Sequence, residues 1–227
     1  MHKLFRNSWY WLLDYSYVVT HQLKSFFDHS HPSQYRQKST TSIILIPGIY
    51  ENWKFMKPIA KLLYAEGHDI HIIDGLGYNR GTVEAMAQVV SDYIASHHLN
   101  DVTLVTHSKG GLIGKYLLSV HNQSNVVNGL VALNAPFSGS RYAAIFPLKS
   151  LRIFVPTSEI LMTLGNNKLV NRLIVSIYGR FDPHIPGGSH LEGAHNIELD
   201  TYGHFRIISD PAIHAAIVAS VRRFIKD

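Results

Sequence analysis

The stretch that decides the fold is Val102-Thr-Leu-Val-Thr-His-Ser-Lys-Gly-Gly111, in which an apolar, β-favouring run stops abruptly at a serine. A helical pattern, Leu112-Ile-Gly-Lys-Tyr-Leu-Leu118, follows at once, so the sequence predicts a sharp strand-to-helix turn with Ser108 at its apex. The two glycines after Ser108 let neighbouring backbone pass close to the turn without a Cβ clash. A turn of this kind presents the hydroxyl and directs the first N–H groups of the helix at the same point, where they can stabilise a developing oxyanion.

Two further predicted strands end close to residues that could assist this serine. An apolar run at residues 173–178 leads to Asp182, and a second run at residues 196–199 precedes His204. Because the carboxyl ends of parallel strands meet at one edge of a sheet, we expect these side chains to lie near Ser108. A serine hydroxyl needs an adjacent general base, for which we take His204. Asp182 would orient the imidazole and stabilise its charged form.

Other residues could fill these two roles. The chain has 15 histidines, so the residue type alone is weak evidence. His190 and His195 are the nearby rivals of His204, but His195 enters the last predicted strand whereas His204 lies past its end. Asp200 is the alternative acid because it is close to His204 in the sequence.

The chain order Ser, Asp, His resembles that of the lipase and carboxylesterase branch of the α/β-hydrolases. Ile43-Ile-Leu-Ile-Pro-Gly48 and Asn134-Ala-Pro-Phe-Ser-Gly-Ser140 add to this resemblance, which covers the chain from about residue 40 to its end. The usual Gly-x-Ser-x-Gly signature has Thr106 in its first glycine position here. In that branch, one oxyanion donor follows the glycine after the first strand and the other follows the nucleophile. The resemblance therefore implies that the backbone N–H groups of Ile49 and Lys109 are the two oxyanion donors.

The activity that the resemblance implies is cleavage of carboxylic esters through an acyl-enzyme on Ser108, with no cofactor and no metal. An acyltransferase or thioesterase on the same fold is the alternative among enzymes. A non-catalytic binding protein with an α/β-hydrolase-like fold is the alternative from another class, because one fold can host many functions. We read His107 as supporting the turn, and expect the Lys109 ammonium over the site mouth or in solvent.

The expected fold is a single-domain α/β-hydrolase with a mostly parallel central sheet, helices on both faces and a short lid or insert. Apolar runs at 43–46, 70–73 and 129–133 alternate with helical patterns at 55–66 and 83–94. We assign residues 1–40 to an N-terminal aromatic helix and linker, residues 41–227 to the hydrolase domain, and residues 135–172 to the insert. The insert is apolar enough either to pack on the sheet or to line an acyl pocket, and Tyr50, Phe137 and Phe146 are the substrate-binding candidates.

Composition narrows the remaining function classes. A formal net charge of +5 favours acidic surfaces or anionic lipid, but the basic residues are scattered and no nucleic-acid partner is expected. No cysteine is present, so there is no disulfide or thiolate chemistry. No run approaches the ~18 apolar residues of a membrane span, and no signal peptide is recognised. We therefore expect a cytoplasmic protein whose substrate is a small-molecule or lipid ester.

The aromatic segment at residues 9–27 has two interpretations. Tryptophan and tyrosine favour membrane interfaces, so an amphipathic helix here could bring the protein to a lipid surface as a peripheral contact. The other interpretation is a helix that packs back onto the domain. Asp14 interrupts the most apolar part of the segment, which favours packing.

Overall fold

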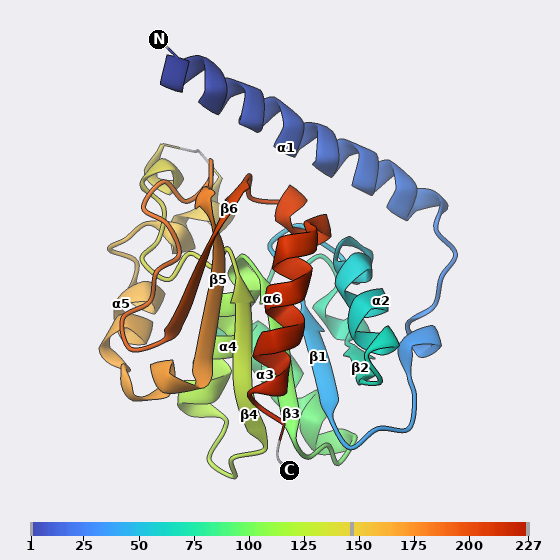
Figure 1. Cartoon of the computed structure of the whole chain (residues 1–227). Coiled ribbons are helices and arrows are strands. Elements are labelled where there is room, and N and C mark those ends of the chain that lie inside the picture. Colours follow the sequence, from blue (N-terminus) through green and yellow to red (C-terminus); the bar gives the residue numbers. More distant parts are fainter. Residues whose placement is uncertain (1, 146–147, 226–227) are drawn as a thin grey trace.

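Six parallel strands form one sheet in the order β2-β1-β3-β4-β5-β6 (Figure 1). The structure is a computed structural model that describes residues 2–145 and 148–225. The strands are β1 (Ser42–Ile46), β2 (Asp69–Ile72), β3 (Val102–His107), β4 (Val127–Leu133), β5 (Ile174–Phe181) and β6 (His195–Tyr202). β1 and β3 are buried along their whole length, as expected for parallel strands that helices cover on both faces.

Helices cover the two faces of this sheet (Figure 1). They are α2 (Lys57–Ala65), α3 (Val83–Ser96), α4 (Lys109–Val120), α5 (Glu159–Asn166) and α6 (Pro211–Arg222). A further helix, α1 (His2–Phe27), precedes the sheet in the chain. One core layer packs α3, α4 and α5 against the sheet, and the other packs α2 and α6 against the opposite face. The expected single-domain α/β fold with a parallel central sheet is confirmed.

The register of the central strands places three loops side by side. Ile46, the last residue of β1, pairs with Thr106, and the last residue of β3, His107, pairs with Leu133 at the end of β4. The loops that follow β1, β3 and β4 therefore leave the sheet at the same edge. Candidate functional residues gather at this edge, as the arrangement of parallel strands requires.

The helix α1 lies across that same edge (Figure 1). On its inner face, the ring of Tyr10 stacks on Tyr202 with ring centroids 4.4 Å apart, and the Tyr17 hydroxyl is 2.7 Å from the Ser209 hydroxyl. The segment thus packs on the domain, the interpretation that the sequence favoured. Its outer face remains exposed. None of the described helices is long and apolar enough to cross a membrane.

The insert at residues 135–172 divides between the core and the site. It contains α5 and three short 3₁₀ helices, Arg141–Ala144, Lys149–Phe154 and Leu169–Leu173, the last of which leads into β5. Leu161 and Leu164 of α5 are buried in the core, whereas Leu151 and Phe154 line a pocket beside Ser108. The insert therefore both packs on the sheet and lines the pocket, the two roles that its apolar composition allowed.

Candidate active site

Ser108 occupies the strand-to-helix turn in a left-handed conformation, with φ 51° and ψ −119°. The turn depends on Gly110, where an added Cβ would lie 2.3 Å from the carbonyl oxygen of Ile46. Any larger residue there would push α4 away from the end of β1. Thr106 takes the first glycine position of the signature without disturbing the turn, since it is fully buried and its hydroxyl reaches the Val131 carbonyl at 3.4 Å.

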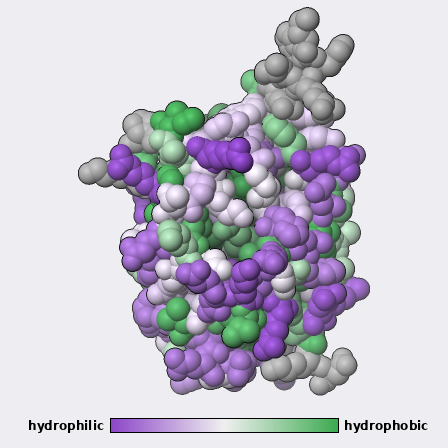
Figure 2. Space-filling view, turned by 90° about the vertical axis from the view of Figure 1, so that its left-hand side faces the viewer, coloured by the Kyte–Doolittle hydropathy of each residue, from purple (hydrophilic) through white to green (hydrophobic). Residues whose placement is uncertain are grey.

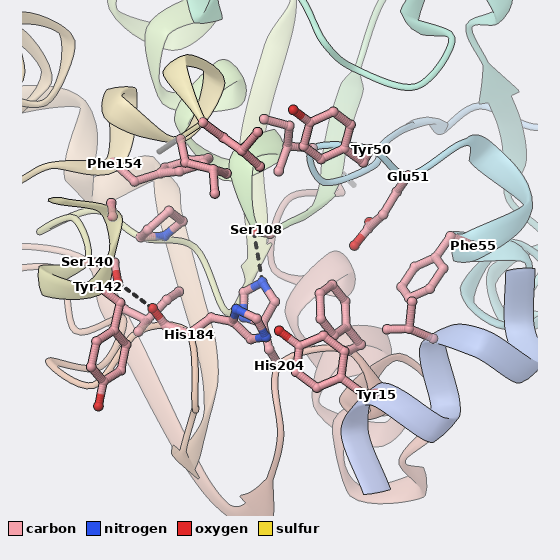
Figure 3. A pocket seen from close by; sticks show the side chains of 18 of the residues that line it. Tyr15, Tyr50, Glu51, Phe55, Ser108, Ser140, Tyr142, Phe154, His184 and His204 are labelled. Atoms are coloured by element: carbon pink, nitrogen blue, oxygen red, sulfur yellow. Dashed lines mark hydrogen bonds between the residues drawn. The ribbon is translucent and has the colours of Figure 1, made fainter. Parts of the chain in front are cut away.

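The structure brings Ser108, His204 and Asp182 into one hydrogen-bonded chain, of which Figure 3 shows the contact between Ser108 and His204. Nε2 of His204 is 2.9 Å from Oγ of Ser108, and its Nδ1 is 2.7 Å from Oδ2 of Asp182. All three residues are buried. They follow β3, β6 and β5 respectively, so each lies at the carboxyl end of its strand.

The electrostatics of this chain suit a general base. Burial alone would lower the pKa of His204, but the charge of Asp182 and its hydrogen bond outweigh burial and raise that pKa above its ordinary value of 6.5. Burial would raise the pKa of Asp182, but the facing His204 and backbone N–H donors lower it instead. Oδ1 of Asp182 accepts from the N–H groups of His184 and Ile185, at 2.7 and 3.0 Å. The carboxylate is thus held in one orientation toward the imidazole.

The rival residues lie elsewhere. His190 and His195 are exposed, and His195 is the first residue of β6, at the opposite end of the strand from His204. Asp200 is also exposed, and it pairs with Arg180 at 3.1 Å rather than with His204. The structure therefore brings only the preferred histidine and aspartate to Ser108.

Of the two residues expected to supply the oxyanion-binding N–H groups, Ile49 lines the same pocket as Ser108 and Lys109 directly follows the serine. Lys109 is the first residue of α4, where a helix leaves its N–H without an intrahelical partner. Neither this N–H nor that of Ile49 donates to any residue in the described part of the chain. The loop that holds Ile49 is fixed by Glu51, whose Oε2 accepts from the N–H of Gly48 at 2.7 Å.

His107, just before the serine, ties this loop to His204. Its Nδ1 is 2.9 Å from Oε2 of Glu51, and its Nε2 is 2.9 Å from the carbonyl oxygen of His204. The imidazole therefore links Glu51, in the loop after β1, to the backbone of the His204 loop. His107 therefore contacts both the loop after β1 and the backbone of His204, in addition to preceding the turn.

The Lys109 ammonium lies neither over the site mouth nor in solvent, so both expectations for it were wrong. It is fully buried and donates to the carbonyl oxygens of Asn79 and Gly81, at 2.8 and 2.5 Å. Asn79 in turn donates to the Pro47 carbonyl at 2.6 Å. Burial lowers the pKa of Lys109 to about 8. Lys109 thus ties the turn at residues 79–81 to the start of α4, and Asn79 ties the same turn to the loop after β1.

Asp14 is the site residue that sequence reasoning missed. It is fully buried on the inner face of α1, and its carboxylate accepts from the backbone N–H groups of His204, Phe205 and Arg206 at 2.8, 2.9 and 3.0 Å. Gly203 permits this approach, since a Cβ there would lie 2.7 Å from Oδ1 of Asp14. No local signal could identify the role, because the partners are about 190 residues away along the chain.

A pocket of about 320 Å³ opens beside Ser108. Its lining is mostly apolar and comes from α1, the loop after β1, the insert and the loops after β5 and β6: Tyr15, Val18, Ile49, Tyr50, Phe55, Pro136, Tyr142, Ala143, Leu148, Leu151, Phe154, Ile185 and Phe205 are among its members. Figure 3 shows Tyr15 of α1 beside His204, with Tyr50 and Phe154 on the far side of Ser108. The N-terminal helix is thus one wall of the pocket.

The three predicted substrate-binding residues differ in placement. Tyr50 lines the pocket, and its hydroxyl is 2.5 Å from that of Ser150. Phe137 is not among the described lining residues; instead it is buried in the core, with its ring 6.0 Å from the Lys115 ammonium of α4. The correction follows from the turn after β4, where Pro136 faces the pocket and the next side chain faces the core. Phe146 lies outside the described residues.

His184 is a second residue that the sequence did not single out. It lines the pocket with its ring 4.9 Å from that of His204, and its buried Nε2 has no hydrogen-bond partner among the described residues. Burial, followed by the charge of His204, lowers the pKa of His184 to about 3. At neutral pH the His184 imidazole beside His204 is therefore uncharged.

Known proteins share this architecture. A family model described as the alpha/beta hydrolase fold matches residues 41–154, half of the chain. No curated protein matches the sequence. The solved mature lipase of Bacillus licheniformis is similar in fold, with a TM-score of 0.65 and 15% identity over 82% of this chain and 94% of that one.

Two further solved structures show the same likeness of fold. An extracellular alpha/beta-hydrolase from a Paenibacillus species has a TM-score of 0.53 and 20% identity, over 82% of this chain and 100% of that one. A bacterial membrane phospholipase A has a TM-score of 0.58 and 13% identity, over 83% of this chain and 81% of that one.

Proposed function

Because the chain belongs to the alpha/beta hydrolase fold family, we propose that it is a serine hydrolase that cleaves carboxylic esters. The observation that carries the proposal is the buried hydrogen-bonded chain from Ser108 through His204 to Asp182. A serine hydroxyl in contact with an imidazole that is itself held by a carboxylate is the arrangement that activates serine for attack.

The reaction begins when Oγ of Ser108 attacks the ester carbonyl carbon and Nε2 of His204 accepts the hydroxyl proton. The resulting oxyanion is stabilised by the N–H groups of Ile49 and Lys109. His204 then gives its proton to the leaving alcohol, and an acyl-enzyme remains on Ser108. Water, deprotonated by His204, attacks the acyl carbon and releases the acid, which regenerates the free serine.

The pocket supports an apolar acyl group. The insert contributes Leu148, Leu151 and Phe154 to its lining, and α1 contributes Tyr15 and Val18. Ligand pockets of this kind bury apolar surface and use a few polar groups for orientation.

The test is covalent labelling by a fluorophosphonate probe, read by intact mass and peptide mapping. We expect one adduct, on Ser108, in the wild type and none in Ser108→Ala. The matched control is Ser138→Ala, a serine in the loop after β4 that does not line the pocket, and it should be labelled like the wild type. Efficient labelling of Ser108→Ala would refute the assignment.

A chain-length series of p-nitrophenyl esters then tests the substrate class. We expect kcat/KM to rise with acyl length until the pocket is filled, because each buried methylene adds ~0.8 kcal/mol of apolar transfer energy. A preference for acetate over every longer acyl group would contradict the apolar pocket. A protein that takes up the probe nowhere and hydrolyses no ester would instead be a binding protein of this fold.

A further inference from the structure

The outer face of α1 carries a row of exposed apolar side chains. Trp9, Leu12, Val19 and Leu23 are 57%, 58%, 57% and 59% exposed. Their spacing of three, seven and four residues places them on one side of the helix, opposite the inner face that holds Asp14. We call these four residues the outer stripe. Soluble proteins rarely leave four large apolar side chains exposed on one side of a helix unless that side contacts a partner.

The outer stripe lies beside the mouth of the pocket. Tyr15, next to the stripe on α1, is 42% exposed and lines the pocket at the same time. Across the pocket, Tyr142 and Leu148 of the insert are also partly exposed lining residues, at 42% and 51%. The helix therefore presents an apolar surface from which a hydrophobic molecule can pass directly to Ser108.

Positive charge gathers at the C-terminal end of the same helix. Four lysines, Lys24, Lys54, Lys57 and Lys61, line a cavity of about 480 Å³ between the end of α1 and the start of α2. Asp28 is the one carboxylate in the lining, and it is paired with Lys57 at 2.5 Å. The N-terminus of α2 adds the positive end of its dipole to this cluster. An anionic group is the ligand that such a surface attracts.

From these observations we propose that α1 is a membrane-docking element, whose outer stripe inserts into the interface of a bilayer that contains anionic lipids. An amphipathic helix with tryptophan on its apolar face lies in the plane of such an interface, and basic side chains at its edge strengthen binding to anionic headgroups. The charge complementarity selects the anionic bilayer as the occupant. Delivery of a lipid ester from this bilayer to Ser108 also rests on the proposed hydrolase function.

The test measures sedimentation with phosphatidylcholine vesicles, with and without phosphatidylglycerol. The Ser108→Ala protein is used so that binding is measured without any hydrolysis. We expect binding to the vesicles that contain phosphatidylglycerol and a decrease as salt is added. Combined Leu12→Glu, Val19→Glu and Leu23→Glu should reduce binding at least ~10-fold, and Lys24→Gln and Lys61→Gln should each reduce it ~5-fold on anionic vesicles only.

The matched control places the same charges on another exposed apolar surface. Met162→Glu and Leu169→Glu change residues that are 58% and 83% exposed in and after α5. The face that carries α5 is largely hydrophilic, with hydrophobic side chains only in scattered patches (Figure 2). We expect these variants to bind vesicles like the parent protein. Leu12→Gln, Val19→Gln and Leu23→Gln provide a second, uncharged stripe variant should the glutamates disturb folding.

Several outcomes would overturn docking. The first is that the parent protein does not sediment with anionic vesicles. The second is that the stripe and control variants lose vesicle binding equally. The third is that the parent protein is a dimer, that the stripe variant is a monomer, and that neither binds vesicles. The proposed hydrolase fails separately. Soluble-ester hydrolysis without vesicle binding refutes docking alone, and vesicle binding by a protein without ester hydrolysis refutes the hydrolase and leaves docking in place.

Discussion

Ser108 is held in a backbone conformation that most residues avoid. A positive φ of 51° outside glycine costs on the order of 1–2 kcal/mol, and surrounding contacts must maintain it. They do so through the hydrogen bond from the Ser108 N–H to the Leu133 carbonyl at 2.9 Å and through the glycine at position 110. Strain that is maintained by its surroundings is typical of a residue whose position serves chemistry.

Single substitutions should separate the residues bonded to Ser108 from their rivals. We expect His204→Ala to lower kcat on a soluble ester by a factor on the order of 10³ or more. Asp182→Asn should also be severe, because Nδ1 of the imidazole loses the partner that sets its tautomer. The controls are His190→Ala, His195→Ala and Asp200→Asn, all at exposed positions, and each should retain most of the activity. A larger loss in any control than in its partner variant would reverse the assignment.

The pH dependence of kcat/KM should report the raised pKa of His204. His204 must be neutral to accept the serine proton, so activity is lost as the pH falls through its pKa. Asp182 raises this pKa above its ordinary value of 6.5. We therefore expect the midpoint of the acid limb, measured on a soluble ester in the free enzyme, to lie above pH 6.5. A midpoint below 6.5 would show that the paired carboxylate does not control the base.

The helix α1 contributes residues to the site although it lies outside the sheet and its two covering helix layers. Its inner face supplies both a wall of the pocket and the carboxylate that receives three backbone N–H groups of the His204 loop. Without Asp14 the buried N–H of His204 would have no partner, at a cost of about 1–3 kcal/mol, and the two part-buried donors of Phe205 and Arg206 would lose theirs. The packing of α1 on the domain therefore also fixes the backbone that carries His204.

Asp14→Asn should affect the base even though Asp14 does not touch the imidazole. The amide can accept at one atom only, so its NH₂ group must face at least one backbone N–H. We expect the free energy of unfolding to fall by roughly 1–3 kcal/mol and kcat to decrease. The charge of Asp14 is one of the causes that raise the pKa of His204. Its removal should therefore move the acid limb to lower pH, a shift that a loss of stability alone does not produce.

Ser16→Ala is the matched control on the same helix. Ser16 is exposed and its hydroxyl bonds only within α1, to the Leu12 carbonyl at 2.7 Å. Its pH profile, measured by the same assay, should coincide with that of the wild type. An unshifted profile in Asp14→Asn would mean that α1 serves only as structural cover for the site.

Two buried lysines of α4 should have opposite effects on the stability of the whole molecule. Lys109 is bonded to carbonyl oxygens of the turn after β2. The Lys115 ammonium, 1% exposed as a residue, has the Phe137 ring 6.0 Å away and no hydrogen bond to any residue in the described ranges. Burial lowers the pKa of Lys115 from 10.5 to about 8, so its charge disfavours the folded state at neutral pH.

Lys115→Met should stabilise the protein. We expect the free energy of unfolding at pH 7, from urea denaturation, to rise by on the order of 1–3 kcal/mol, because a buried charge is replaced by an apolar chain of similar length. The folded pKa is the lower one, so the charge penalty is full below pH 8 and disappears as the pH approaches 10.5. The gain should shrink over this range.

Lys109→Met is the comparison, and it should destabilise because it leaves the Asn79 and Gly81 carbonyls without their donor. A loss of stability in Lys115→Met as large as that in Lys109→Met would show that the Lys115 ammonium has a partner in the folded protein. The two substituted positions are six residues apart on the same helix, so a general effect on α4 would change the stability of both variants alike.

Local sequence determined the parallel sheet and the position of Ser108, Asp182 and His204 within it. Buried parallel strands are continuous apolar runs, and a residue just past such a run must lie at the carboxyl edge of the sheet. The turn at Ser108 was predictable for the same reason, since an apolar run, a serine, two glycines and a helical pattern are adjacent in the chain. Preference for His204 over His195 rested on this logic alone.

Only the tertiary structure decided what surrounds that core. The Asp14 carboxylate meets the His204 loop across 190 residues, the Lys109 ammonium meets the turn after β2 across 30, and Phe137 faces the core instead of the pocket. Each outcome depends on which donors, acceptors and cavities distant segments bring to one point. Hydrophobic periodicity indicates which face of a helix or strand is buried, but it does not indicate which polar group of a distant segment will contact that face.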